Sequence, residues 1–117
     1  MRLIFLLALC LTICATAFGG YETVVISELQ TAKALAGVVT DKNGEALSDV
    51  IVREISPDGK TTIRSTTTDS EGRWSLPRAG RKTYHLLFLK SGFDNLQIRV
   101  RLSKLGKELR VSLPVAT

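Results

Sequence analysis

Apolar and polar residues alternate along much of the chain after residue 34, with the period of two that is typical of β-strands. The clearest case is the segment 96–102, in which leucine, isoleucine and valine alternate with glutamine and arginine. Alternation or a high content of β-branched residues predicts further strands at 36–40, 50–55, 61–68, 73–76, 84–89 and 109–115. Because no stretch after residue 17 keeps a helical period, these short segments predict an all-β protein, a seven-stranded β-sandwich.

Two of the turns between these segments use the same pattern, Thr-Asp-x-x-Gly. The first contains Asp41, Asn43 and Gly44, and the second contains Asp69 and Gly72. Aspartate and asparagine side chains bond to nearby backbone N–H groups, and glycine adopts positive φ without steric cost. We therefore predict that these residues form tight turns and have structural roles.

The first 17 residues have a different pattern. A positive charge at Arg2 precedes a mostly apolar stretch, and the small residues of CATA follow at 14–17. This order is that of a secretory signal peptide, and we predict cleavage after Ala17. An uncleaved membrane anchor is the alternative, although the apolar stretch is shorter than the roughly 20 residues that span a bilayer. A lipoprotein signal would need a small residue before Cys10 or Cys14, where the chain has leucine and isoleucine.

This boundary divides the chain into a signal peptide at 1–17, a linker or edge strand at 18–34, and one domain at 35–117. A domain of this size can fold without metal or disulfide staples. Both cysteines lie in the predicted signal peptide, so the remaining chain has no thiol for catalysis or metal binding. We expect an exported protein, secreted or periplasmic, without a cofactor.

The chain carries a formal net charge of +5, and its basic residues are spread along the sequence rather than gathered in one run. A modest charge of this kind favours solubility and weak attraction to anionic surfaces. It does not provide the dense basic stripe of a nucleic-acid-binding domain. We expect no nucleic-acid partner, and membrane contact only through an uncleaved signal peptide.

Four sequence blocks, at residues 37–41, 44–52, 68–77 and 84–93, follow one another in an order that resembles the carboxypeptidase regulatory-like domain family. The resemblance covers about residues 35 to 115. It implies a Greek-key β-sandwich of the prealbumin or transthyretin type, and an accessory, non-catalytic role in secreted and outer-membrane proteins. The chain departs from the family before the second strand, where members often have proline and this chain has Ala46 and Ser48.

Catalytic residues are scarce. A catalytic zinc needs about three protein ligands, whereas His85 is the single histidine of the chain. A transthyretin-like hydrolase, the nearest enzyme by resemblance, needs several histidines and a characteristic C-terminal tetrapeptide, and this chain ends in PVAT. His85 lies in segment 84–89, whose apolar residues on both faces predict a strand covered on both sides. We expect a structural histidine and no enzymatic activity, with the hydrolase as a remote alternative.

The acidic residues of the two Thr-Asp turns raise the question of calcium. Asp41, Asn43 and Glu45 alternate on the first turn, and Asp69 and Glu71 lie on the second. Calcium takes 6–8 oxygen ligands, so neither turn suffices alone. Turn formation explains these residues more simply, and a shared calcium site at one end of the sandwich stays open.

Two groups of residues are candidates for binding a partner. Arg99, Arg101 and Arg110 are predicted to share an outward sheet face, where an anionic partner would relieve their repulsion. A solvated face, with Glu108 nearby, is the alternative. Trp74, with Tyr84 and Phe93, would form an aromatic platform for carbohydrate, although their inward alternation favours a place in the core.

These observations predict an exported, non-catalytic accessory domain that binds protein or acts in assembly at the cell envelope. A carbohydrate-binding module related to starch-binding sandwiches is the alternative. The partner is therefore expected to be a protein or a glycan at the cell surface. The oligomeric state does not follow from the sequence.

Overall fold

A computed structural model describes residues 22–116 of the chain, so the predicted signal peptide at 1–17 lies outside the described residues. The described part confirms the all-β prediction. Its strands are β1 (Thr23–Thr40), β2 (Ile51–Ile55), β3 (Thr62–Thr67), β4 (Arg73–Ser75), β5 (Tyr84–Leu89), β6 (Asn95–Leu102) and β7 (Lys107–Ser112). In this part of the chain no helix is long and apolar enough to cross a membrane.

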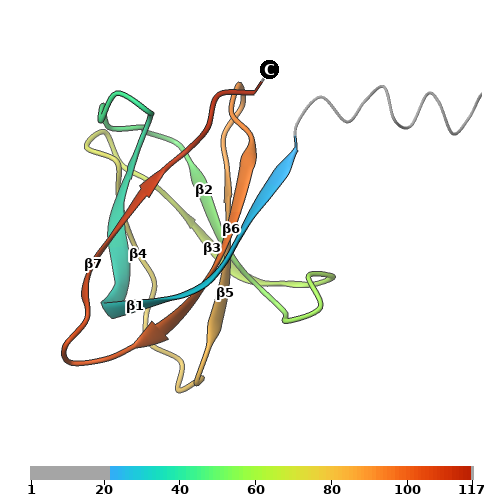
Figure 1. Cartoon of the computed structure of the whole chain (residues 1–117), viewed down its shortest axis with the longest axis vertical. Coiled ribbons are helices and arrows are strands. Elements are labelled where there is room, and N and C mark those ends of the chain that lie inside the picture. The colour runs from blue at the N-terminus through green and yellow to red at the C-terminus, as the bar shows by residue number, and fades with distance from the viewer. Residues whose placement is uncertain (1–21, 117) are drawn as a thin grey trace, which may run out of the picture.

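The seven strands form one mixed, nearly closed, barrel-like sheet (Figure 1). Hydrogen-bonded neighbours follow the order β3-β2-β5-β6-β1-β4, and β7 pairs with β1 outside this path. β1 runs parallel to β6 and to β7, whereas the other pairs are antiparallel. The sheet is therefore continuous, where the predicted sandwich has two separate sheets, because β1 pairs with strands on both sides of the molecule.

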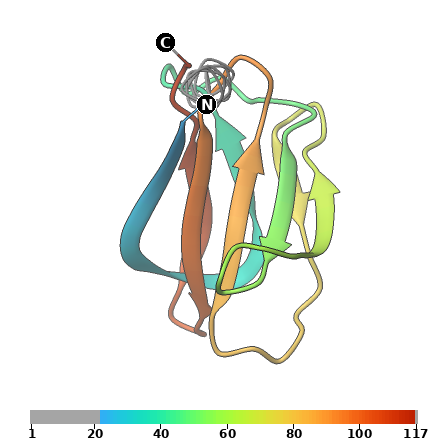
Figure 2. The ribbon, with the colours of Figure 1, turned by 90° about the vertical axis from the view of Figure 1, so that its right-hand side faces the viewer.

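β1 reaches both sides because the chain reverses direction within it (Figure 2). Residues 23–32, the first arm, pair with β6, and residues 36–40, the second arm, pair with β4 and β7. Of the two alternatives for residues 18–34, the structure has a strand from Thr23 onward. At the bend, the backbone N–H of Ser103 donates to the carbonyl of Ala32 at 2.8 Å, which holds the β6–β7 turn against β1.

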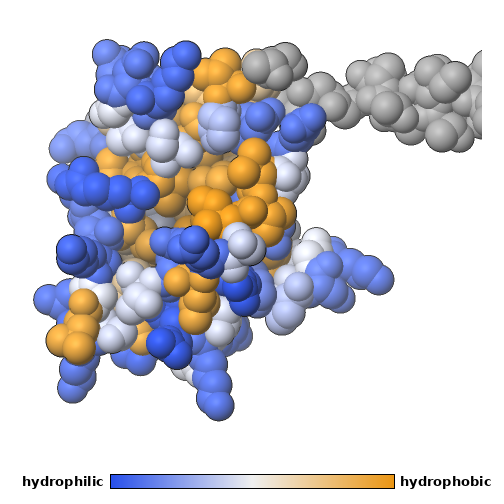
Figure 3. Space-filling view, in the orientation of Figure 1, coloured by the Kyte–Doolittle hydropathy of each residue, from blue (hydrophilic) through white to orange (hydrophobic). Residues whose placement is uncertain are grey.

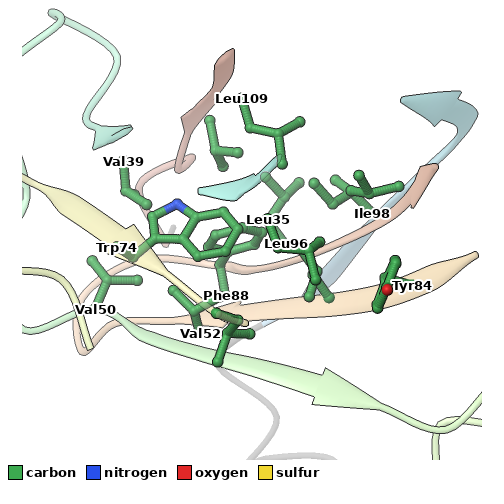
Figure 4. Close-up of a cluster of buried hydrophobic side chains, with 14 of the residues drawn as sticks. Leu35, Val39, Val50, Val52, Trp74, Tyr84, Phe88, Leu96, Ile98 and Leu109 are labelled. Atoms are coloured by element: carbon green, nitrogen blue, oxygen red, sulfur yellow. The ribbon is translucent and has the colours of Figure 1, made fainter. Parts of the chain in front are cut away.

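The core fills the barrel with the inward side chains of six strands (Figure 4). Leu96, Ile98 and Val100 of β6 are buried, whereas Arg99 and Arg101 are exposed, as the alternation predicted. On β5 the inward residues are buried but the outward ones are only half-buried. The prediction of a strand covered on both sides is therefore wrong for β5, because no second layer lies over the outer face among the described residues.

Candidate binding site on the open side of the barrel

The two Thr-Asp turns have the same hydrogen bonds. Asp41 Oδ1 accepts from the backbone N–H groups two and four residues later, at 2.8 and 3.0 Å. Asp69 Oδ1 does the same at 2.8 and 3.0 Å. The backbone N–H groups of Arg73 and Glu71 hold the pKa of Asp69 below its ordinary value. Both carboxylates are thus used to form the turns.

The two turns also lie side by side at one end of the barrel. The N–H of Val39 donates to the carbonyl of Gly72 at 2.8 Å, and the N–H of Leu47 donates to the carbonyl of Val39 at 2.9 Å. Within residues 22–116 no group of three or more His, Cys, Asp or Glu side chains is placed to hold a metal. His85 is half-buried on β5, opposite Ile55 and Arg99 of the neighbouring strands.

The glycines of these turns provide a matched test of the packing between them. Gly72 has φ +75°, and a Cβ there would lie 2.5 Å from the carbonyl oxygen of Val39. Gly44 has φ +85° with open space around it. We expect Gly44→Ala to cost about 1–2 kcal/mol, the price of a left-handed conformation. Gly72→Ala should cost at least about 1 kcal/mol more in urea unfolding, because backbone must also move. Equal losses would contradict the close packing of Gly72 against Val39.

The aromatic residues of the predicted carbohydrate platform lie mainly inside the barrel. Trp74 is 4% exposed and Tyr84 is fully buried, whereas Phe93 is half-buried. The Trp74 ring contacts the Phe88 ring edge-on, with centroids 5.7 Å apart. The Tyr84 hydroxyl accepts the backbone N–H of Ala79 at 3.0 Å. Neither Trp74 nor Tyr84 presents a ring face to solvent.

The three predicted arginines are exposed but do not form one cross-strand cluster. Arg99 and Arg101 lie on β6 and Arg110 lies on β7, and these strands pair with β1 and not with each other. The Arg99 guanidinium donates to the carbonyl of Ser27 on β1. Arg110 lies 3.5 Å from Glu108. The expected mutual repulsion across strands is therefore absent, because β6 and β7 pair mainly with different arms of β1 and are not neighbours in the sheet.

A buried ionic cluster around Glu54 was not predicted from the sequence. Glu54 is 1% exposed, and its carboxylate accepts from Arg64 Nε at 2.6 Å and from Arg81 Nε at 2.5 Å. Burial raises the pKa of Glu54, but the hydrogen bonds and charges of the two arginines outweigh burial and hold the pKa below its ordinary value. The sequence did contain a sign of this burial, because Glu54 follows Val50 and Val52 at the same two-residue spacing and so lies on their inward face.

The most distinctive surface is the open side of the barrel, between the first arm of β1 and β7. In residues 22–116 the first arm pairs with β6 and, at its last residue Ala32 alone, with Lys107 of β7, and β7 pairs only with β1. A hollow of about 230 Å³ lies between the two strands. Its apolar lining is formed by Ile26 of β1, Leu96 and Ile98 of β6, and Leu109 and Val111 of β7.

The first arm is apolar on both of its faces. Val24 is the partner of Leu96 and faces the hollow, whereas Val25 and Leu29 are the partners of Gln97 and Arg99 and face outward. The first arm carries four of the seven large hydrophobic residues that the described structure exposes, namely Val24, Val25, Ile26 and Leu29. Val25 is 60% exposed. Figure 3 shows the resulting apolar area on the face between β7 and the first arm. Proteins usually protect exposed strand edges with charge, proline or a covering segment, so an apolar edge of this kind indicates a contact surface.

Comparison with known proteins agrees with this all-β structure. The model of one family, the carboxypeptidase regulatory-like domain, matches residues 34–114. This match includes β2 to β7 and the second arm of β1, and it leaves the whole first arm outside. No curated protein matches the chain. Because the match covers more than half of the sequence, the chain belongs to the carboxypeptidase regulatory-like domain family.

Proposed function

We propose that this chain is an exported, non-catalytic binding domain that takes an extended segment of a protein partner on the open side of its barrel. Domains of its family are usually non-catalytic. The observation that carries the proposal is the apolar hollow between two strands that each have an edge without a partner strand in residues 22–116. Export rests on the apolar N-terminal sequence, which has the order of a signal peptide.

An extended segment suits this side of the barrel for two reasons. The free edges of the first arm and of β7 offer backbone N–H and C=O groups, and strand addition satisfies such groups through main-chain hydrogen bonds. The side chains of Ile26, Leu96 and Val111 form an apolar surface beneath these edges. A strand with apolar residues at alternate positions would bury them there and keep its other face in solvent.

The surface favours a protein over a carbohydrate. The carbohydrate alternative relied on the ring of Trp74, which is 4% exposed and packed against Phe88. The hollow itself is lined by aliphatic side chains together with Gln30, Arg110 and Ser112, and by no aromatic ring. An aliphatic surface is suited to the apolar side chains of a peptide strand.

Site-specific photo-crosslinking in cells that export the chain tests this proposal. A photoreactive residue replaces Val24, which is the partner of Leu96 on the hollow side of the first arm, and in the control it replaces Ile63, which is 44% exposed on the edge strand β3. We expect a protein adduct from position 24 and not from position 63. Adding Ile26→Lys should reduce this adduct about tenfold, because a buried, unpaired ammonium costs more than 1.4 kcal/mol.

Mass spectrometry of the exported chain should find Phe18 at its N-terminus.

The outcomes distinguish the possible partners. An adduct of two copies of the chain would identify the partner as the chain itself. Equal adducts from positions 24 and 63, or no effect of Ile26→Lys, would contradict binding at the open side. Saturable binding on a glycan array without any protein adduct would support the carbohydrate alternative instead.

A further inference from the structure

The end of the barrel that contains the β1 bend is strongly basic. The residues that form this basic end come from the bend, from the loop between β4 and β5, and from β6 and the turn after it. They are Lys33, Arg78, Arg81, Lys82, Arg101 and Lys104. They line two hollows of about 330 and 420 Å³ that share Arg78 and Leu102, and neither hollow is lined by an acidic residue.

Most of these charges are available to a partner. Arg81 is bound to Glu54, but the other five residues form no ion pair within residues 22–116. Arg78, Lys82, Arg101 and Lys104 are all exposed. Positive charges that converge without acidic partners produce a local positive potential that attracts anionic surfaces.

A large apolar side chain projects from the same end. Leu105 is 93% exposed at the tip of the β6–β7 turn, between Lys104 and Lys107. Figure 3 shows a small apolar area bordered by hydrophilic residues over this turn. The N–H of Ser103 in this turn donates to the carbonyl of Ala32. Gly106 lets the turn pack closely against the same residue, since a Cβ added at Gly106 would lie 2.4 Å from the Ala32 backbone. A rigid turn thus presents a leucine surrounded by basic side chains.

The opposite end of the barrel differs in charge and contains both ends of the described chain. It holds the two Thr-Asp turns, with Asp41, Glu45, Asp69 and Glu71. The backbone N–H of Glu22 donates there to Asp94 Oδ1 at 3.3 Å, and the N–H of Ala116 donates to the carbonyl of Gly92 at 3.1 Å. Positive and negative charges are therefore concentrated at opposite ends of the domain. An anionic surface would attract the basic end and repel the acidic end.

We propose that the basic end docks on an anionic lipid bilayer, with Leu105 entering the headgroup region and the surrounding lysine and arginine side chains binding lipid phosphates. Peripheral membrane binding combines buried apolar area with attraction to anionic lipids, and one signal alone gives marginal binding. The basic end supplies both signals on one surface. This docking is a second membrane contact, separate from that of an uncleaved signal peptide, because Glu22, the first described residue, lies at the opposite end.

Vesicle co-sedimentation of the exported chain tests the charge requirement. The probes are phosphatidylcholine vesicles with and without about 30% phosphatidylglycerol, a fraction that gives a clearly negative surface. We expect binding only to the anionic vesicles, weakened by salt. Lys82→Ala with Lys104→Ala should weaken binding about 30-fold, since each basic residue near such a surface contributes about 1 kcal/mol. The control, Lys42→Ala with Lys90→Ala, removes the same charge at the opposite end and should change binding less than threefold.

Leu105→Ser separates a bilayer from other anionic partners. It should weaken vesicle binding about tenfold, because the apolar contribution is lost, and should leave binding to soluble polyphosphate unchanged. Equal loss in the two double variants would overturn the proposal. The proposal would also be overturned if the chain bound polyphosphate and if Leu105→Ser left vesicle binding unchanged. That result would identify the basic end as a site for soluble polyanions.

Discussion

Glu54→Ala is expected to lower the free energy of unfolding by about 3 kcal/mol. Removing one partner of a buried ion pair typically costs 3–5 kcal/mol, because the remaining charges keep their desolvation penalty without compensation. The lower end of this range applies here, since the side chains of Arg64 and Arg81 are 23% and 39% exposed and can reach water. Urea unfolding followed by the fluorescence of Trp74, the single tryptophan, measures the loss.

The surface ion pairs of the same protein provide the control. Glu108 is 44% exposed and lies 3.5 Å from Arg110 and 3.9 Å from Arg73. Glu108→Ala should cost less than about 1 kcal/mol, because exposed pairs are weak. A loss for Glu54→Ala no larger than that for Glu108→Ala would contradict the role of the buried cluster.

The same cluster should make stability depend on acid pH. The pKa of Glu54 lies below its ordinary value of 4.5, so the stabilisation by the ionised group is complete above that pH and is lost as the pH falls further. Asp58 and Asp69 also have lowered pKa values and change stability in the same direction. The difference between the wild type and Glu54→Gln isolates Glu54, and we expect this difference to shrink as the pH falls below 4.5.

Much of the strand pattern could be predicted because most strands have one buried and one exposed face. β6 is the clearest example, since burial alternates along it as its sequence does. The first arm of β1 was uncertain because most of its side chains are exposed, so the core imposes no alternation on residues 23–31. The parallel pairing of β1 with β6 and β7 depends on the reversal at Ala32, which no local motif marks.

The candidate surfaces were harder to predict than the strands. Turn chemistry is local, so the hydrogen bonds of Asp41 and Asp69 follow from spacing alone. The open side and the basic end instead bring together residues that are far apart in the sequence, such as Ile26 with Val111 and Lys33 with Arg78. Bases that look evenly spread along the chain can converge in space, which explains why charge alone did not indicate a surface.

Trp74→Ala should lower the free energy of unfolding by about 3–5 kcal/mol, because it removes the largest side chain of the core and leaves a cavity. The total free energy of unfolding of a domain of this kind is about 5–15 kcal/mol, so the variant should unfold in part near physiological temperature. This result would exclude Trp74→Ala as a probe of carbohydrate binding, since lost binding would reflect lost structure.

Trp74→Phe is the informative companion to this variant. Phenylalanine keeps an aromatic contact with Phe88, and the indole N–H that it removes has no hydrogen-bond partner among the described residues. We expect Trp74→Phe to cost less than about 2 kcal/mol by circular dichroism in urea, which does not need the tryptophan signal. A larger loss would mean that the indole nitrogen is bonded in solution. A stable Trp74→Ala variant would contradict the burial of this ring and return Trp74 to the candidates for ligand contact.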